Sequence, residues 1–292
     1  MQKNRENTYY LPDIPLSKNL NPDTSLERVC RDKKVLFLVT PSHVLRDVLK
    51  KAVPYIMEGI SLVIASKGIE YETLLTLNNV VKEVLPTSIY DIFYLSGPSF
   101  AREVSRKIPT AVTLAGENNK RIKEIQKMLS TSYFRVYTNK DILGVALGGA
   151  LKNVIAIAAG ISDGLGLGFS TRSALITRGL AEITRLGIKL GAKASTFSGL
   201  AGLGDLILTC TSDLSRNRTV GKKIAKGASI NEIQSEMKMV AEGIINTKSA
   251  YSLAKKYKVE MPVTEKVYQI LYKDLKPEKA VLELMERELK EE

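Results

Sequence analysis

ILGVALGGALKNVIAIAAGI, the stretch Ile142–Ile161, marks the point at which this sequence changes from one kind of fold to another. Only Lys152 and Asn153 are polar within it. A lysine on a buried helix face loses several kcal/mol of hydration free energy unless another group pairs with its ammonium. We therefore interpret Lys152 as a buried functional lysine, of the kind that enzymes use on carbonyls or anions.

The same stretch is long enough to cross a membrane, which is the main alternative. Its composition argues against membrane insertion, because it is mostly Ala and Gly, with four Gly residues. A central lysine alone costs ~2.5–3.5 kcal/mol on membrane insertion. Residues 1–30 are polar and contain prolines, so we expect no signal peptide.

Before this stretch, strands and helices alternate. The predicted strands are Val35–Val39, Ser61–Ser66, Asp91–Ser96, Thr110–Gly116 and Phe134–Thr138. Helical stretches lie between them, near 43–53, 70–85 and 119–130. Such alternation predicts an α/β fold with a doubly wound parallel sheet, in which the apolar run VLFLV at 35–39 is buried on both faces.

After this stretch, helical periodicity continues to the C-terminus. Ser229 with Glu232 forms a capping box, Thr264 is a candidate N-cap, and Pro277 suits the first turn of a last helix. We therefore predict a Rossmann-like domain over 1–140 and an all-helical substrate domain over 141–292. The Lys152 helix lies at their junction, and clefts between domains are common ligand sites.

Composition excludes some classes of function. The net charge of +12 suggests nucleic acid as a partner, but lysines are spread through every segment and only 6% of residues are aromatic. We therefore expect no nucleic-acid partner; the positive field would instead favour an anionic small molecule. The two cysteines, Cys30 and Cys210, match no metal or redox spacing, which is typical of a cytoplasmic protein.

Polar and glycine-rich turns follow three of the predicted strands: Thr40–His43, Lys67–Gly68 and Ser96–Ala101. Ligands of open parallel sheets bind at the carboxyl ends of the strands, where these turns lie. His43 is the only histidine and has no visible partner, so a turn or a place beside a cofactor suits it better than acid–base work. We therefore expect lysine and aspartate side chains to be the catalytic groups.

Two motifs stand out in the helical half. Gly199–Asp205, GLAGLGD, allows close approach of the backbone and presents one carboxylate, although a tight turn between helices would have the same sequence. Ser215–Arg218, SRNR, opens a helix with donors at its N-terminus, which is a pattern for binding phosphate. The alternative is a solvated basic face that continues through Lys222, Lys223 and Lys226.

Several stretches together carry a resemblance to a known family. They are TPSHVLR at 40–46, ASKG at 65–68, LSGPSFAREV at 95–104, GALKNVIAIAAG at 149–160, GLAGLGD at 199–205, SRNRTVG at 215–221, VAEG at 240–243 and VEMPVTEKVY at 259–268. In order and spacing, from about Asn4 to the C-terminus, the chain resembles the bacterial-type NAD(P)-dependent glycerol-3-phosphate dehydrogenases. The resemblance implies reduction of dihydroxyacetone phosphate to sn-glycerol 3-phosphate with NAD(H) or NADP(H), in the cytoplasm, for phospholipid synthesis. It also implies a homodimer.

The resemblance assigns roles to matching residues. Lys152 corresponds to the catalytic lysine, Lys67 to a second lysine that contacts substrate and nicotinamide, and Asp205 to the carboxylate that orients both substrate and lysine. The remaining substrate contacts implied are Gly97, Ser99, Ser215, Arg216 and Asn217, and the remaining cofactor contacts are Ala101, Arg216, Val240 and Glu242. No metal is implied.

The sequence departs from the family pattern at its beginning. No GxGxxG occurs in the 292 residues, and the glycines of Gly164–Gly168 follow a helix instead of a strand. We therefore expect a Rossmann-like sheet without the family's first strand–turn–helix unit, an unpaired edge at Val35–Val39 and weak binding of the dinucleotide. A smaller departure is Ser170, where the family usually has Asn.

Two other functions remain open at this point. One is a cofactor-deficient relative that acts as a basic binding module, and the other is a hydroxy-acid dehydrogenase of the same two-domain plan. The presence of Lys67, Lys152 and Asp205 together argues against the first. The phosphate-type motif around Arg216 argues against the second.

Overall fold

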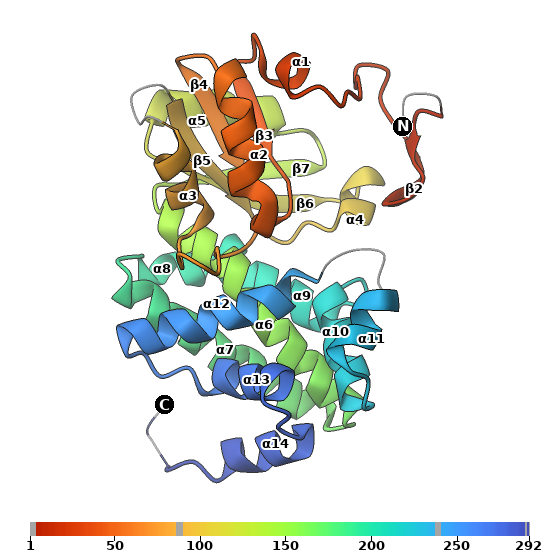
Figure 1. Ribbon diagram of the computed structural model, residues 1–292, viewed down its shortest axis with the longest axis vertical. Helices are drawn as coiled ribbons and strands as arrows, with labels where there is room; N and C mark the ends of the chain where they lie inside the picture. The colour runs from red at the N-terminus through yellow and green to blue at the C-terminus, as the bar shows by residue number, and fades with distance from the viewer. Residues whose placement is uncertain (1–3, 86–89, 237–240, 290, 292) are drawn as a thin grey trace.

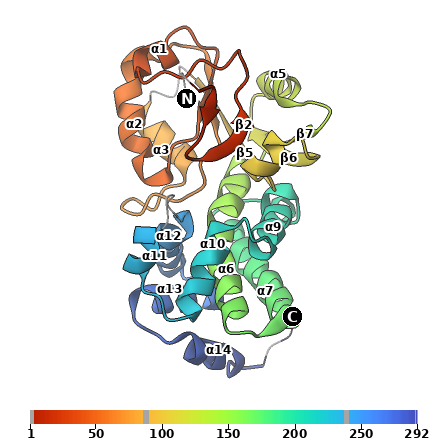
Figure 2. The same cartoon turned by 90° about the vertical axis from the view of Figure 1, so that its right-hand side faces the viewer.

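The computed structural model describes residues 4–85, 90–236, 241–289 and 291. A sheet with its helices forms one half, and a group of helices forms the other (Figure 1). Helix α6 (Ile142–Gly164) begins beneath the sheet and runs through the middle of the helical half, as the side view shows (Figure 2). The Lys152 helix therefore joins the two halves.

The main sheet has the strand order β3-β4-β5-β6-β7. Its strands are β3 (Val35–Leu38), β4 (Ile60–Ile64), β5 (Tyr90–Ser96), β6 (Thr110–Gly116) and β7 (Phe134–Asn139). All five lie where the sequence predicted strands. A hairpin of β1 (Glu6–Asn7) and β2 (Leu11–Pro15), which was not predicted, precedes them.

The prediction of an entirely parallel sheet needs a correction. Strands β3, β4 and β5 are parallel, but β6 pairs antiparallel with β5, and β7 is parallel to β6. The connection from β5 to β6 carries only the five-residue helix α4 (Ala101–Ser105). That helix is ~7.5 Å long, whereas a seven-residue strand is ~23 Å long, so the chain re-enters the sheet from the end that it has just left.

The prediction that VLFLV at 35–39 is buried on both faces is also wrong. Phe37 is 40% exposed and Val39 is 65% exposed, whereas every residue of β4 is buried. Strand β3 lies at one edge of the sheet, and none of the described strands pairs with its outer side. The apolar run therefore belongs to an edge strand in this structure.

Helices cover both faces of the sheet. On one face α2 (Leu45–Ala52) and α3 (Leu77–Val84) pack on β4 and β5, and α5 (Asn119–Leu129) packs on the other. The expected helix near 70–85 begins only at Leu77, because a short turn closed by the Ile69–Thr76 bridge precedes it. The short helix α1 (Leu26–Cys30) and the 3-10 turns η1 (Ser42–Val44) and η2 (Val53–Tyr55) complete this half.

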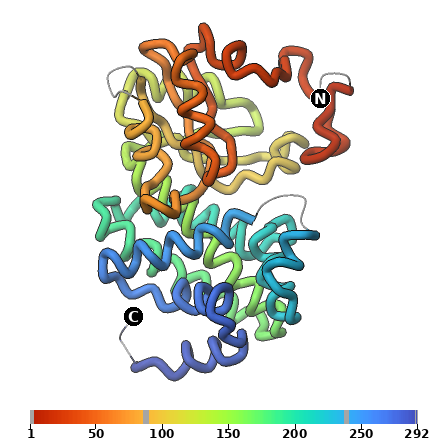
Figure 3. Tube along the Cα trace, viewed as in Figure 1, coloured from red at the N-terminus to blue at the C-terminus, as the bar shows by residue number. Residues whose placement is uncertain are grey.

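The rest of the described chain is helical, as its path shows (Figure 3). After α6 come α7 (Gly168–Lys189), α8 (Ala194–Phe197), the π-helical turn η4 (Leu200–Gly204), α9 (Asp205–Thr211), α10 (Arg216–Ala225), α11 (Ile230–Glu236), α12 (Glu242–Tyr257), α13 (Pro262–Tyr272) and α14 (Pro277–Met285). The other helices pack around α6 as a central element.

Two of the three predicted helix signals are confirmed. The Ser229 and Glu232 side chains form the capping box, and Pro277 opens α14. Thr264 is not an N-cap, because α13 begins two residues earlier, at Pro262. Its backbone N–H and hydroxyl instead donate to Glu182 of α7, whose buried carboxylate also accepts the N–H of Val263.

Helix α6 passes the length and composition test for a membrane span, but it lies inside the protein. Of its most apolar 18-residue window, 89% is buried. Its glycines allow neighbouring backbones to come close: a Cβ on Gly160 would lie 2.0 Å from the carbonyl oxygen of Arg218 in α10. The Ala- and Gly-rich composition is thus explained by close packing between helices.

Candidate active site

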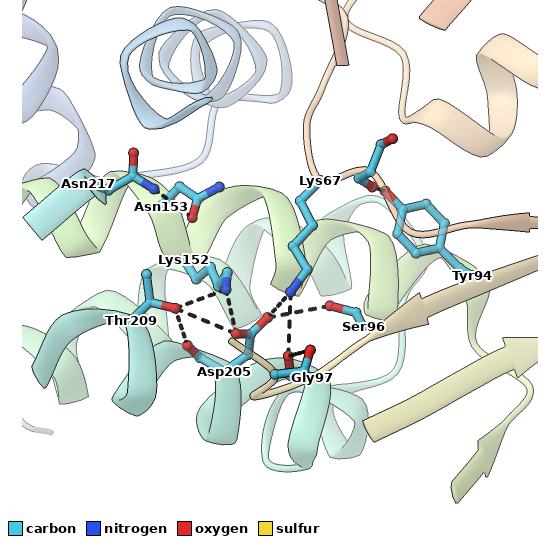
Figure 4. Close-up of polar contacts among 11 residues, drawn as sticks. Lys67, Tyr94, Ser96, Gly97, Lys152, Asn153, Asp205, Thr209 and Asn217 are labelled. Atoms are coloured by element: carbon cyan, nitrogen blue, oxygen red, sulfur yellow. Dashed lines mark hydrogen bonds and ion pairs between the residues drawn. The ribbon is translucent and has the colours of Figure 1, made fainter. Parts of the chain in front are cut away.

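Lys152 lies at the centre of a buried polar cluster (Figure 4). Its residue is 7% exposed, and its Nζ donates to Asp205 Oδ1 and, at 2.9 Å, to Thr209 Oγ1. The other oxygen of Asp205 accepts from Lys67 Nζ at 2.5 Å. One carboxylate, only 1% exposed, therefore binds both lysines.

Each of these side chains is held by a different element. Lys67 follows β4, where the chain leaves the sheet, and its Nζ is also 3.5 Å from the carbonyl oxygen of Gly97, just after β5. Asp205 is the first residue of α9, and Thr209 lies one turn later on the same face. The carboxyl ends of the strands thus meet the N-terminus of α9 against α6, as the position of ligand sites in such sheets predicts.

The electrostatics of the cluster favour proton transfer near neutral pH. Burial, helped by the nearby ammonium of Lys67, lowers the pKa of Lys152 to about 7, against the attraction of Asp205. Burial alone would raise the pKa of Asp205, but the two ammonium groups outweigh it and hold that pKa below its ordinary value. Asp205 therefore stays ionised while Lys152 can gain or lose its proton.

Thr209 and Ser96 were not singled out from the sequence. The Thr209 hydroxyl donates to the carbonyl oxygen of Asp205 at 2.6 Å, so it is oriented to accept from Lys152. Ser96 Oγ lies 3.5 Å from Asp205 Oδ2. The spacing of Asp205 and Thr209, four residues apart in an expected helix, is the one sequence signal that could have found Thr209.

The start of α10 lies against α6 beside this cluster. Ser215 is the N-cap, and its Oγ accepts the N–H of Arg218 at 3.3 Å. Asn217 donates to Asn153 Oδ1 at 2.9 Å and accepts from the N–H of Gly243 at 3.0 Å. Asn217 thus ties α10 to the residue that follows Lys152, while Arg216 is exposed at the helix start.

Arg218, the second arginine of the predicted phosphate motif, is buried. Its guanidinium binds Asp163 and Asp213, each at 2.6 Å. Because these two carboxylates already pair with it, Arg218 is not a donor for a ligand here.

The other candidate residues are more scattered. Ser99 and Ala101 are exposed just after β5, and Ser99 Oγ donates to the carbonyl oxygen of Gly97 at 3.2 Å. Glu242, the first residue of α12, accepts from the N–H and hydroxyl of Ser42, at 3.1 and 2.5 Å, and so links the two halves. Val240 lies outside the described residues.

His43 lies in the turn η1 and is exposed, so it is away from the buried cluster. Within the described ranges, no group of three or more His, Cys, Asp or Glu side chains could hold a metal ion. The buried cluster itself contains two ammonium groups, one carboxylate and hydroxyl groups.

Comparison with known proteins shows the family of the chain. Residues 1–122 match the family described as NAD-dependent glycerol-3-phosphate dehydrogenase N-terminus, and residues 141–282 match its C-terminus. The chain belongs to the NAD-dependent glycerol-3-phosphate dehydrogenase family.

Individual relatives support the same assignment. The chain is 55% identical to a glycerol-3-phosphate dehydrogenase [NAD(P)+] of Geobacter sulfurreducens, over 100% of this chain and 88% of the relative. It is 52% identical to that of Syntrophobacter fumaroxidans, over 100% of this chain and 86% of the relative. The crystal structure of glycerol-3-phosphate dehydrogenase from Coxiella burnetii superposes with a TM-score of 0.95 at 41% identity, over 98% of this chain and 87% of that one.

Proposed function

We propose that this chain interconverts dihydroxyacetone phosphate and sn-glycerol 3-phosphate with NAD(H) or NADP(H). The observation that carries the proposal is the carboxylate of Asp205 bound to both Lys67 and Lys152 inside a chain of this family. With both lysines protonated, the cluster has a net charge of +1, which stabilises the negative charge that develops on a ketone oxygen during reduction. In the family, the nicotinamide supplies or accepts the hydride.

The residues at the strand ends fit the nicotinamide end of such a cofactor. The Lys67 side chain stays 22% exposed above the buried Asp205, so the cluster can be approached from the side of the sheet. Lys67, Ala101, Arg216, Val240 and Glu242 are the residues that we propose hold the cofactor. No GxGxxG, the usual glycine turn for a pyrophosphate, occurs in these 292 residues.

In the proposed reaction Lys152 moves the proton. Its Nζ gives a proton to the C2 oxygen of the ketone in reduction and takes one from the C2 hydroxyl in oxidation. Asp205 and Thr209 hold this Nζ in place, which lowers the entropy that the lysine side chain loses on reaching the reactive geometry. Lys67, with Gly97 and Ser99 beside it, would orient the substrate.

Phosphate recognition is assigned to the start of α10. The first backbone N–H groups of that helix and the exposed guanidinium of Arg216 form an anion site, with Ser215 and Asn217 beside it. Phosphate binding there would hold the carbonyl near Lys152, because Asn217 is hydrogen-bonded to Asn153. The site would thus lie between the Rossmann-like domain, residues 1–140, and the helical substrate domain, residues 141–292, and would take residues from both.

Two substitutions test this function, with NADH or NADPH at saturating concentration. Lys152→Ala should lower kcat by at least ~10²-fold, the usual contribution of a positioned acid, whereas exposed Lys189→Ala should not. Arg216→Ala should raise KM for dihydroxyacetone phosphate far more than for dihydroxyacetone, since only the former has a phosphate. Retention of more than a third of kcat without Lys152 would remove that lysine from the mechanism.

The proposal extends to the setting of the enzyme. We place it in the cytoplasm, where glycerol 3-phosphate is consumed in phospholipid synthesis, and the two free buried thiols of Cys30 and Cys210 agree with a reducing compartment. A homodimer is part of the same proposal, and sedimentation equilibrium tests it. A hydroxy-acid dehydrogenase is disfavoured, because the start of α10 around Arg216 has the pattern of a phosphate site.

A further inference from the structure

Arg218 joins three parts of the helical half. It lies in the first turn of α10, and its guanidinium binds Asp163 in the last turn of α6 and Asp213 in the loop before α10. Its own side chain is buried, as is most of Asp163. Charge-assisted bonds of 2.6 Å in a buried setting are strong and directional, so they fix relative position.

Helix α10 runs alongside α6 over several turns. Asn217 bonds to Asn153, a Cβ on Gly221 would lie 2.1 Å from the carbonyl oxygen of Ile157, and a Cβ on Gly164 would lie 2.6 Å from the Cβ of Ala225. Backbone contact through glycine sets the distance between the two helices. The Asn217–Asn153 hydrogen bond and the Arg218–Asp163 ion pair add polar links between the two helices.

The two helices carry the two ends of the proposed substrate site. Lys152 lies on α6, and the anion site is the N-terminus of α10. Asp163 is eleven positions beyond Lys152, ~16 Å along the axis of α6. The Arg218–Asp163 ion pair therefore ties the position of α10 to the far end of the helix that carries Lys152.

We propose that Arg218 is a positioning residue that sets the distance between the anion site and Lys152, and thereby the length of ligand that can reach both. This inference rests on the proposed function. A ligand that contacts both the anion site and Lys152 binds well only when the distance between them matches its length. The affinity of an anion that contacts the anion site alone does not depend on that distance.

Calorimetry without cofactor tests this inference with two ligands, glycerol 3-phosphate and inorganic phosphate. Arg218→Gln should weaken glycerol 3-phosphate about 10- to 100-fold and inorganic phosphate less than about threefold. Arg218→Lys, which keeps a cation for Asp163, should restore part of the difference. The matched control is Arg172→Gln: Arg172 binds the other oxygen of Asp163 at 3.0 Å but belongs to α7 and not to α10, so the ratio of the two affinities should not change.

Asp213→Asn covers the case in which Arg218→Gln does not fold. The Asp213 side chain is 87% exposed, so its loss should be tolerated, and it should shift the affinity ratio in the same direction by about threefold. Equal weakening of both ligands, or no change in either, would overturn the positioning role. A wild-type chain that does not bind glycerol 3-phosphate would contradict the proposed function itself, and this inference with it.

Discussion

Asp205 is the carboxylate that pairs with Lys152 in the buried site. Its two oxygens are divided between two lysines, so neither ammonium is left alone in a buried site. Asp205 remains ionised because the ammonium groups outweigh the effect of burial on its pKa. Lys152, buried and next to a second cation, is the group of the three whose proton is loosely held.

The pH dependence of the two reaction directions should reflect this. With a pKa of about 7, Lys152 is protonated below that pH and can act as the acid for reduction, whereas above it the neutral amine can act as the base for oxidation. We expect kcat for reduction to fall as pH rises through about 7, and kcat for oxidation to rise.

Pre-steady-state rates between pH 6 and 9 measure both directions. Lys152→Arg is the matched control, because a guanidinium keeps its proton throughout this range. Any activity that it retains should show no inflection near pH 7. Wild-type profiles that are flat from pH 6 to 8.5 in both directions would mean that Lys152 does not carry the proton.

At the scale of elements, the start of α13 depends on a buried acid. Glu182 of α7 accepts the N–H groups of Val263 and Thr264, which would otherwise lack partners at a helix N-terminus. Burial raises the pKa of Glu182 from its ordinary value of 4.5 to about 7, although the hydrogen bonds from Val263 and Thr264 oppose the shift. The carboxylate thus caps the helix at the cost of its own desolvation.

This pKa predicts how stability changes with pH. Between pH 4.5 and about 7 the folded chain holds a proton on Glu182 that the unfolded chain has lost. The contribution of Glu182 to the free energy of unfolding is therefore greatest below pH 4.5 and declines by about 3 kcal/mol as pH rises to 7. Urea denaturation of wild type and Glu182→Gln at pH 5, 6, 7 and 8 should show a difference that shrinks with pH. A difference independent of pH would contradict it.

The sequence predicted the positions of strands and helices better than the way in which they pack and pair. Apolar runs and helical periodicity located β3 to β7 and α6, because these patterns depend on local residues. The direction of β6 depends on how far the short helix α4 can carry the chain, which no strand pattern records. Thr264 was misread as a cap because its actual partner, Glu182, is distant in sequence.

At the scale of the whole molecule, the contact between Lys152 and Asp205 depends on how the chain folds. Burial of Lys152 was predicted from its apolar neighbours, and the structure confirms it. The pairing with Asp205 brings together residues 53 positions apart and could be expected only through the family resemblance. Arg218 shows the opposite case: its motif suggested a ligand contact, but the carboxylates of Asp163 and Asp213 pair with it instead.

The exposed edge of β3 affects how readily molecules of this protein associate in solution. Phe37 and Val39 form an apolar strip beside a strand edge with which none of the described strands pairs, while the chain carries a net charge of +12. Like charges keep such molecules apart across ~30 Å at 0.01 M salt but only ~8 Å at 0.15 M. Light scattering should therefore show association that grows as sodium chloride is added, and Val39→Lys should reduce it. Association that salt suppresses would instead indicate attraction between opposite charges, with the strand edge playing no part.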